Sequence, residues 1–286
     1  MNTLAFLSAL IGFAVTLGSI ILYFRTIPRG TVPEKVGGFA SRLGVGVAIS
    51  AIAVYLGVTG DGRAGFLVYL PAGLGLFFGL FILWVLTQRK TPLGDIKVKV
   101  GDEILPFSAT TSDGTPFDSS ELSGKRVLLK FFRGGWCPYC SAELVAFNAM
   151  APKFEEYGVS VIALSKDTPD EAALHKSRDG LNFPLLSDPE LKVVRSYGVE
   201  HHKALGQTKN PKSTIGGIPI GLAPFNFQAM AIPTTLLVDE AGVIRWVDQS
   251  EDYRLRSSTD RVMEAVRAAF APHEHRKPQT KLTAKG

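Results

Sequence analysis

Three long apolar stretches fill the first third of the chain. Residues 1–24 carry no charged side chain, and neither do Leu43–Gly60 or Ala64–Gln88. A helix needs roughly 20 apolar residues to cross the hydrocarbon core of a bilayer. We therefore expect a membrane region over residues 1–90. The predicted spans are residues 3–24, 43–60 and 64–87.

Two other interpretations of these stretches stay open. Residues 1–24 could form a cleaved signal peptide, but they lack the basic n-region of such a segment. Three buried helices of a soluble protein are the second alternative. Frequent glycine in all three stretches favours membrane helices, which tolerate glycine and use it for close helix contacts.

Residues 102–270 alternate between the strand and the helix pattern, after a short linker at 91–101. Asp113-Gly114 between extended runs predicts a hairpin within Asp102–Gly124. The nearly continuous apolar run Val127–Phe132 predicts a central strand that is buried on both faces. The other expected strands are Val159–Leu164, Phe183–Leu186, Thr235–Val238 and Val243–Val247. The expected helices begin at Cys137 or Pro138, Thr168, Asp188 and Ser258, and end at Tyr157, Arg178, Tyr197 and Phe270.

This order of elements predicts an α/β fold with a mixed sheet flanked by helices. Val199–Ala231 fits neither period and is expected to be a long irregular loop. Residues 271–286 are polar and basic, and we expect a disordered tail there.

The basic excess of the chain lies in the membrane region. Residues 1–90 hold seven basic side chains against two acidic ones, a difference of +5 that equals the net charge of the whole chain. The rest of the chain is neutral, so the charge does not indicate nucleic-acid binding. The basic residues gather after the first and third spans, and cytoplasmic loops of membrane proteins are enriched in Lys and Arg. We therefore expect the N-terminus outside and everything after residue 88 in the cytoplasm.

Both cysteines of the chain lie in the five-residue stretch Trp136–Cys140. Two cysteines three positions apart, at the start of a helix, indicate a redox-active dithiol or half of a metal site. The unpaired N–H groups of a helix N-terminus lower the cysteine pKa. The spacing puts both sulfurs on one helix face, so one thiol can attack a disulfide or sulfenic acid formed on the other. Pro138 suits the first helical turn, and Trp136 would shield a sulfur from water.

A zinc site would need two further ligands besides the cysteine pair. We interpret the adjacent histidines His201 and His202 as surface residues, and we expect no bound metal and no cofactor. The other histidine candidates are His175, His273 and His275.

A proline at Pro233, just before a predicted strand, completes a recognisable set of segments. Together they resemble the thioredoxin-like superfamily, and within it the alkyl hydroperoxide reductase/thiol-specific antioxidant (peroxiredoxin-like) family. The resemblance covers about residues 101–270. It rests on Asp113-Gly114, Lys125–Phe132, Trp136–Cys140, Ser165–Asp167, Phe183–Pro189, Tyr197–Val199, Ile232–Asp239 and Gly242–Ile244.

The resemblance implies two different roles for the cysteines. Peroxiredoxins carry a proline and a threonine before the peroxide-attacking cysteine and a glutamate after it, which would make Cys140 the attacker and Glu143 the glutamate. Here Cys137 stands at the threonine position and Arg133 at the proline position. The peroxiredoxin arginine falls near Pro233, where thioredoxins have a cis-proline.

The thioredoxin alternative makes Cys137 the nucleophile and Cys140 the resolving cysteine, with Pro233 packed against the disulfide. The missing threonine and arginine favour this assignment. However, Phe131 stands where thioredoxins carry a buried acid. Arg133 could stabilise a thiolate or polarise a peroxide, or it could be a solvated arginine.

We therefore predict a thioredoxin-like domain behind three transmembrane helices, acting as a membrane-anchored thiol-disulfide oxidoreductase that reduces hydroperoxides. A protein disulfide reductase of thioredoxin type is the alternative, and a non-catalytic metal-binding or scaffold protein is the alternative of another class. The expected partners are a thiol electron donor (thioredoxin-like or a small thiol), a hydroperoxide or disulfide substrate, and the lipid bilayer. The predicted catalytic residues are Cys137 and Cys140, supported by Trp136, Pro138, Arg133, Pro233 and Glu143.

Overall fold

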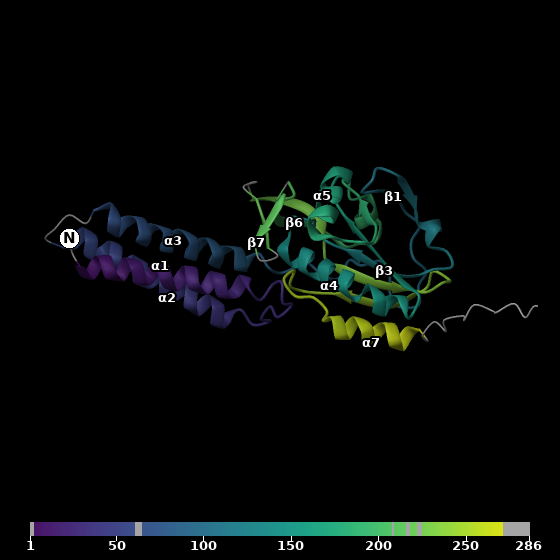
Figure 1. Cartoon of the computed structure of the whole chain (residues 1–286), viewed down its shortest axis with the longest axis horizontal. Coiled ribbons are helices and arrows are strands. Elements are labelled where there is room, and N and C mark those ends of the chain that lie inside the picture. The colour runs from purple at the N-terminus through teal and green to yellow at the C-terminus, as the bar shows by residue number, and fades with distance from the viewer. Residues whose placement is uncertain (1–2, 61–64, 208, 216–217, 222–224, 271–286) are drawn as a thin grey trace, which may run out of the picture.

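The computed structural model describes residues 3–60, 65–207, 209–215, 218–221 and 225–270. The first three helices, α1 (Thr3–Phe24), α2 (Gly37–Thr59) and α3 (Phe66–Thr87), form an elongated bundle at one end of the molecule (Figure 1). Each is long and apolar enough to cross a membrane. The helices expected in this part are thus present, although α2 begins at Gly37 rather than Leu43.

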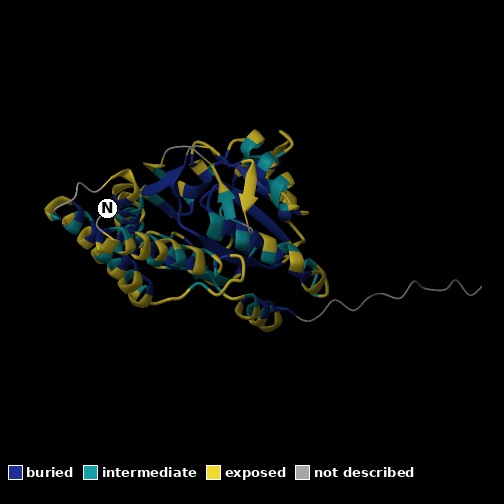
Figure 2. Cartoon of the chain, turned by 60° about the vertical axis from the view of Figure 1, so that its left-hand side comes forward, coloured by how far each residue is buried: buried dark blue, intermediate teal, exposed yellow. Residues whose placement is uncertain are grey.

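The outer faces of the bundle are exposed (Figure 2), and they carry large apolar side chains. Leu22, Tyr55 and Phe77 have exposed fractions of 59%, 66% and 62%. Exposed apolar surface on this scale is rare in soluble monomers and is typical of surfaces that face lipid or a partner.

Glycines bring the three helices into close contact. A Cβ atom added to Gly12 of α1 would lie 2.7 Å from the backbone nitrogen of Ser50 in α2. A Cβ atom on Gly46 would lie 3.0 Å from the backbone nitrogen of Thr16. Gly75 of α3 faces the same Ser50 side chain. Since small residues let helix backbones approach closely in membranes, these contacts favour a tightly packed bundle.

Seven strands form one mixed sheet in the order β11–β10–β3–β4–β5–β1–β2. β3, β4 and β5 run parallel, and the other neighbours are antiparallel. The strands are β1 (Ser108–Thr111), β2 (Pro116–Asp118), β3 (Arg126–Phe131), β4 (Val159–Ser165), β5 (Leu185–Ser187), β10 (Thr234–Val238) and β11 (Ile244–Gln249). The predicted mixed sheet, its entry hairpin and its central strand are confirmed.

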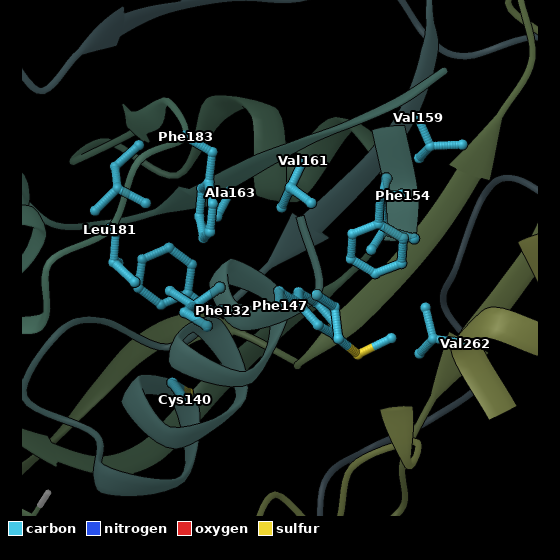
Figure 3. Packing of buried hydrophobic residues seen from close by; sticks show 14 of the residues in the cluster. Phe132, Cys140, Phe147, Phe154, Val159, Val161, Ala163, Leu181, Phe183 and Val262 are labelled. Atoms are coloured by element: carbon cyan, nitrogen blue, oxygen red, sulfur yellow. The ribbon is translucent and has the colours of Figure 1, made fainter. Parts of the chain in front are cut away.

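Helices cover both faces of this sheet, so β3 contributes to two hydrophobic clusters. Leu128 belongs to the cluster under α4, α5 and α7, whereas Val127 and Leu129 belong to the cluster on the opposite face, where α6 packs. Successive side chains of a strand point to opposite faces, which explains this division. Figure 3 shows the first cluster, with Phe147 and Phe154 among its aromatic side chains. The helices are α4 (Pro138–Glu155), α5 (Pro169–Asp179), α6 (Lys192–Ser196), α7 (Thr259–Ala269) and the short 3-10 helix η1 (Ser119–Leu122).

Capping hydrogen bonds form at two of the predicted helix starts, Thr168 and Ser258. The Thr168 hydroxyl accepts a hydrogen bond from the Glu171 backbone N–H, and the Glu171 carboxylate accepts from the Thr168 N–H. Ser258 caps α7 in the same way, by accepting from the Arg261 N–H. Both caps satisfy N–H groups that the first helical turn leaves without a partner.

The expectation of an irregular loop at Val199–Ala231 is wrong. Most of this stretch forms two ribbons, β6 (Glu200–Gln207) with β9 (Phe225–Ala231), and β7 (Ser213–Ile215) with β8 (Ile218–Ile220). Frequent Gly and Pro hid the strand pattern, because they mark turns, bulges and close backbone approaches inside a ribbon as well as loops. The predicted tail at 271–286 lies outside the described residues, and the predicted domain boundaries stay predictions.

Candidate active site

The two cysteines lie at the N-terminus of α4. Cys137 is the N-cap residue, in an extended conformation with φ −82° and ψ 113°, and Pro138 is the first helical residue. Cys140 follows in the first turn, and its side chain is buried in the cluster shown in Figure 3. Both are free thiols, with exposed fractions of 1% and 0%. This start of a helix presents unpaired backbone N–H groups and a positive dipole end, which favour a thiolate.

Positive groups and hydrogen-bond donors converge on Cys140. Burial alone would raise its pKa, but the hydrogen bond from the Cys137 thiol, the Arg256 guanidinium and the backbone N–H of Arg133 lower the pKa to about 5. The Arg256 Nη2 atom lies 3.3 Å from the Cys140 sulfur. For Cys137, burial and the bond that it donates to Cys140 raise the pKa well above its ordinary value. The two thiols are therefore inequivalent, and their surroundings favour the thiolate at Cys140 over the thiolate at Cys137.

A chain of buried charges supports this arrangement. The Lys130 Nζ atom lies 2.7 Å from Glu143 Oε1, and the Arg256 Nε atom lies 2.7 Å from Glu143 Oε2. The side chains of Lys130 and Glu143 are 1% and 4% exposed. Glu143 thus holds the guanidinium of Arg256 in place, and its own charge is compensated from both sides. Buried charges persist in proteins only when they are paired in this way.

The interpretation of Arg133 as a solvated arginine is wrong, because only 2% of the residue is exposed. Its guanidinium carbon lies 3.9 Å from the ring centroid of Tyr253 and 5.2 Å from that of Trp136. Its Nη2 atom donates to the backbone oxygen of Leu205, and its Nε atom lies 3.1 Å from the sulfur of Met230. Arg133 therefore joins the ribbon β6–β9 to the cysteine pair.

Trp136 and Pro233 are both buried. The indole N–H of Trp136 has no hydrogen-bond partner in the described part of the chain. Pro233 directly precedes β10, as expected, but none of the described residues follows a cis peptide bond, so Ile232–Pro233 is trans. The cis-proline that the thioredoxin resemblance implies is thus absent at this position.

A second polar network lies on the other side of α4, next to the cysteines. The Ser141 hydroxyl is 3.2 Å from His175 Nε2, which is 3.1 Å from Asp179 Oδ2, and Arg178 donates to Ser141 at 2.8 Å. His175 is fully buried. Among the described residues, no group of three or more His, Cys, Asp or Glu side chains is placed to hold a metal ion. His273 and His275 lie outside the described residues.

The middle of the cysteine motif contacts the helix bundle. The hydroxyl groups of Tyr139 and Tyr23, the latter near the end of α1, are 3.0 Å apart, and Arg254 Nη1 donates to Tyr23 at 2.9 Å. A pocket of about 260 Å³ lies at this junction. Its lining includes Arg29, Tyr139, Glu143, Phe147, Arg254 and Arg256. The pocket thus borders two of the residues that surround Cys140.

Sequence reasoning found the cysteines, Arg133 and Glu143, but it missed Arg256 and Lys130 as members of the site. Lys130 offered a signal, since it is the one charged residue inside the apolar run Val127–Phe132. Arg256 offered none, because it lies 116 positions from Cys140, in a polar loop before α7.

The fold and the site together define the class of thioredoxin-like domains that carry a pair of cysteines at a helix N-terminus. Within this class the chain belongs to the AhpC/TSA family, whose profile matches residues 100–247. The three apolar helices lie outside the matched part.

Relatives of two kinds are similar to this chain. Thiol-disulfide oxidoreductase ResA of Bacillus thuringiensis (strain Al Hakam) is 36% identical over 104 residues, which are 36% of this chain and 60% of ResA. The chain therefore matches less than two thirds of the length of that relative. Peroxiredoxin Bcp of Escherichia coli (strain K12) is 30% identical over 112 residues, which are 39% of this chain and 72% of Bcp. The crystal structure of peroxidoxin BcpB from Mycobacterium tuberculosis aligns with a TM-score of 0.48 and 23% identity, over 61% of this chain and 99% of that one.

Proposed function

We propose that this protein is a membrane-anchored, thiol-dependent hydroperoxide reductase in which Cys140 attacks the peroxide and Cys137 resolves the product. One observation carries the assignment: Arg256 donates to the Cys140 sulfur, whose pKa is lowered to about 5, whereas the pKa of Cys137 is raised. The thiolate is the reactive form of a cysteine. This assignment reverses the preference for Cys137 that the sequence landmarks gave.

The proposed cycle uses a hydroperoxide as oxidant and two donor thiols as reductant. The Cys140 thiolate attacks one peroxide oxygen, so that an S–O bond forms, the O–O bond breaks and the alkoxide leaves as an alcohol after taking a proton. Cys137 then loses its proton and attacks the sulfur of the Cys140 sulfenic acid, which forms the disulfide and releases water. One donor thiolate attacks this disulfide, and a second completes the reduction and leaves as part of the oxidised donor.

The charged residues around Cys140 have distinct roles in this proposal. Arg256 stabilises the thiolate and then the negative charge that develops on the peroxide oxygens, which is the type of electrostatic stabilisation that contributes most in many enzymes. Glu143 positions Arg256, and Arg133 supports Cys140 through its backbone N–H. Trp136, Pro138 and Pro233 shape the surroundings of the pair.

Reduction of protein disulfides is the second candidate function. The Cys-x-x-Cys pair at a helix N-terminus and the similarity to a thiol-disulfide oxidoreductase favour it. However, both cysteines are buried, so a folded protein would reach neither sulfur without a rearrangement of the junction at Tyr139. A small hydroperoxide or thiol needs less rearrangement than a folded protein to reach the sulfurs, and the junction pocket borders Glu143 and Arg256 beside Cys140, which supports the first function.

Membrane anchoring by α1, α2 and α3 is part of the proposal, and their length and apolar composition support it. The basic residues that follow the first and third helices favour a cytoplasmic location of the redox domain. There the pair would be reduced for most of the time.

Single substitutions of the two cysteines test the proposed function. We expect Cys140→Ser to abolish turnover of hydroperoxide, and Cys137→Ser to allow one oxidation of Cys140 that stops at the sulfenic acid. A sulfenic-acid probe and a disulfide substrate, applied to both variants and to the wild-type protein, separate the alternatives. Peroxide turnover that survives the loss of Cys140 would overturn the assignment.

A further inference from the structure

The ribbon β6–β9 contacts both the cysteine site, through Arg133, and the helix bundle, and Figure 1 shows β6 on the side of the redox domain that faces the bundle. The ring of Phe225 lies 6.3 Å from the ring of Phe81 in α3, and the ring of Phe227 lies 6.2 Å from that of Trp84. Two aromatic side chains of the redox domain thus continue the aromatic surface of a helix that is apolar enough to span a membrane.

The edge of the ribbon at Phe225 and Phe227 is both apolar and exposed. These two residues have exposed fractions of 49% and 45% although they contact α3. They lie two positions apart, so their side chains share one face of β9, whereas Asn226 and Gln228 occupy the other face. Such an alternation of apolar and polar side chains is typical of a strand that has one face in an apolar phase and the other in water.

The contact with Phe81 indicates how deep the edge lies. Phe81 is six residues before Thr87, the last residue of α3, which corresponds to about 9 Å along a helix that rises 1.5 Å per residue. The polar layer on each side of the hydrocarbon core is roughly 5–8 Å thick, from a total bilayer thickness of about 40–45 Å and a core of about 30 Å. At 22 residues α3 is about 33 Å long, close to the roughly 30 Å of the hydrocarbon core, so its last turns lie near the boundary between hydrocarbon and headgroups and Phe225 beside Phe81 reaches the hydrocarbon side of that boundary.

The charge of this part of the chain fits the same location. Between His201 and Ala231 the sequence contains three lysines and no acidic residue. The Nζ atom of Lys203 lies 5.8 Å from the centroid of the Phe227 ring. A lysine beside an aromatic ring at a bilayer surface can extend its ammonium group to the headgroups and is attracted by anionic lipids.

We propose that the Phe225–Phe227 edge of β9 inserts into the interfacial layer of the bilayer beside α3. The inference rests on the proposed membrane anchoring, and it adds a second, peripheral contact of the redox domain with lipid. Continuity with α3, where Phe77 and Trp84 are 62% and 42% exposed, indicates lipid rather than a second copy of the chain as the occupant. Aromatic side chains such as Trp, Tyr and Phe are stabilised at this depth, where apolar acyl chains and polar headgroups meet.

This contact would also fix the cysteine site. Phe227 pairs with Leu205 across the ribbon, and the Leu205 carbonyl accepts the hydrogen bond from Arg133. A Cβ atom added to Gly206 would contact the Trp136 ring, so this part of β6 lies directly against Trp136. The contact of β9 with the bilayer therefore positions the ribbon β6–β9, and this ribbon in turn contacts Arg133 and Trp136.

Site-specific fluorescence in vesicles tests the proposal on the full chain. The variant Cys137→Ser/Cys140→Ser has no native thiol, so a single cysteine introduced at Phe225 can carry an environment-sensitive dye. Asn226→Cys is the matched control on the opposite face of the strand. The exposed Ser123, which caps the end of η1 before β3 begins, is replaced in the aqueous control Ser123→Cys, and Leu80→Cys in α3 is the control for membrane embedding. Circular dichroism and thermal melting verify that each variant is folded.

We expect the dye at position 225 to be blue-shifted and quenched by lipids that carry a shallow spin label, and the dyes at 226 and 123 to be quenched by aqueous iodide instead. Quenching by lipid at position 80 but not at 225 would overturn the inference and leave the membrane anchoring intact. No lipid quenching at position 80 would overturn the anchoring itself. A blue shift at 225 without lipid quenching, which is lost when the lipid-to-protein ratio is raised, would identify a second copy as the occupant and overturn the proposal.

Discussion

The guanidinium of Arg256 lies 3.3 Å from the sulfur of Cys140, although the two residues are 116 positions apart in the chain. Glu143, one helical turn after Cys140, binds the same guanidinium at 2.7 Å. An arginine presents several donors in a planar fork, so it can hold a carboxylate and a thiolate at the same time. This geometry favours Cys140 rather than Cys137 as the thiolate, and two of the following predictions test that assignment.

Replacing Arg256 removes a positive charge and a donor from the Cys140 thiolate. We expect Arg256→Met to raise the pKa of Cys140 by about 1–3 units, the usual effect of losing a close opposite charge. Arg256→Lys is the matched control, since it keeps the charge but loses the fork, and it should raise the pKa by less. Thiolate absorbance near 240 nm as a function of pH measures both shifts. An unchanged titration in Arg256→Met would contradict the role of this residue.

The pH dependence of alkylation distinguishes the two cysteines. The pKa of Cys140 is lowered to about 5, so its thiolate is present at pH 7 and is lost only as the pH falls through about 5. The pKa of Cys137 is raised, so its thiolate forms only in strongly alkaline solution. We expect iodoacetamide at pH 7 to modify Cys140 first in the reduced protein, with a rate that falls on acidification below about pH 5.

Peptide mass spectrometry of the alkylated protein identifies the modified cysteine. A denatured sample serves as the control, because both cysteines should then react at similar rates. Preferential modification of Cys137 at pH 7 in the folded protein would restore the thioredoxin-type assignment.

The sequence predicts those parts of the fold that depend on local patterns. The apolar run Val127–Phe132 and the caps at Thr168 and Ser258 indicate their elements correctly, because burial and capping leave a signature within a few residues. The ribbon β6–β9 could not be predicted, since its strands are joined by a stretch rich in Gly and Pro and it packs on other elements rather than on its own side chains.

The residues of the site likewise fall into those that the local sequence predicts and those that it does not. The cysteine pair and Pro138 are local and were predictable from their spacing at a helix start. The partner of Glu143 was not, because the link between α4 and Arg256 exists only in the tertiary structure. Burial of Arg133 likewise depends on Leu205 and Tyr253, which approach from distant parts of the chain.

Removing the carboxylate of Glu143 should destabilise the protein strongly. Glu143→Gln would leave Lys130, which is 1% exposed, as a buried charge without its partner, and breaking a buried ion pair in this way costs about 3–5 kcal/mol. Lys130→Met is the matched comparison: it should cost less, because Glu143 keeps its ion pair with Arg256. The free energy of unfolding in urea, measured in detergent solution, gives both values. Equal losses in the two variants would show that Lys130 does not depend on Glu143.

The packing of the helix bundle allows a test that leaves the redox domain unchanged. Gly12→Leu would place a side chain against the backbone of Ser50 in α2, with a Cβ-to-nitrogen distance of 2.7 Å that the backbone cannot relieve without moving the helix. Gly18 lies in the same helix, and a Cβ atom there would meet nothing within 4 Å. We expect Gly12→Leu to destabilise the bundle by about 1–3 kcal/mol or more, as overpacking does in other cores. Gly18→Leu should be neutral or slightly stabilising, because glycine inside a helix costs about 0.5–1 kcal/mol relative to alanine.

Thermal unfolding of both variants in the same detergent measures the difference, and alkylation of Cys140 at pH 7 shows whether the domain is intact. If Gly18→Leu lowers the stability as much as Gly12→Leu does, the close contact between α1 and α2 is not what holds the bundle together.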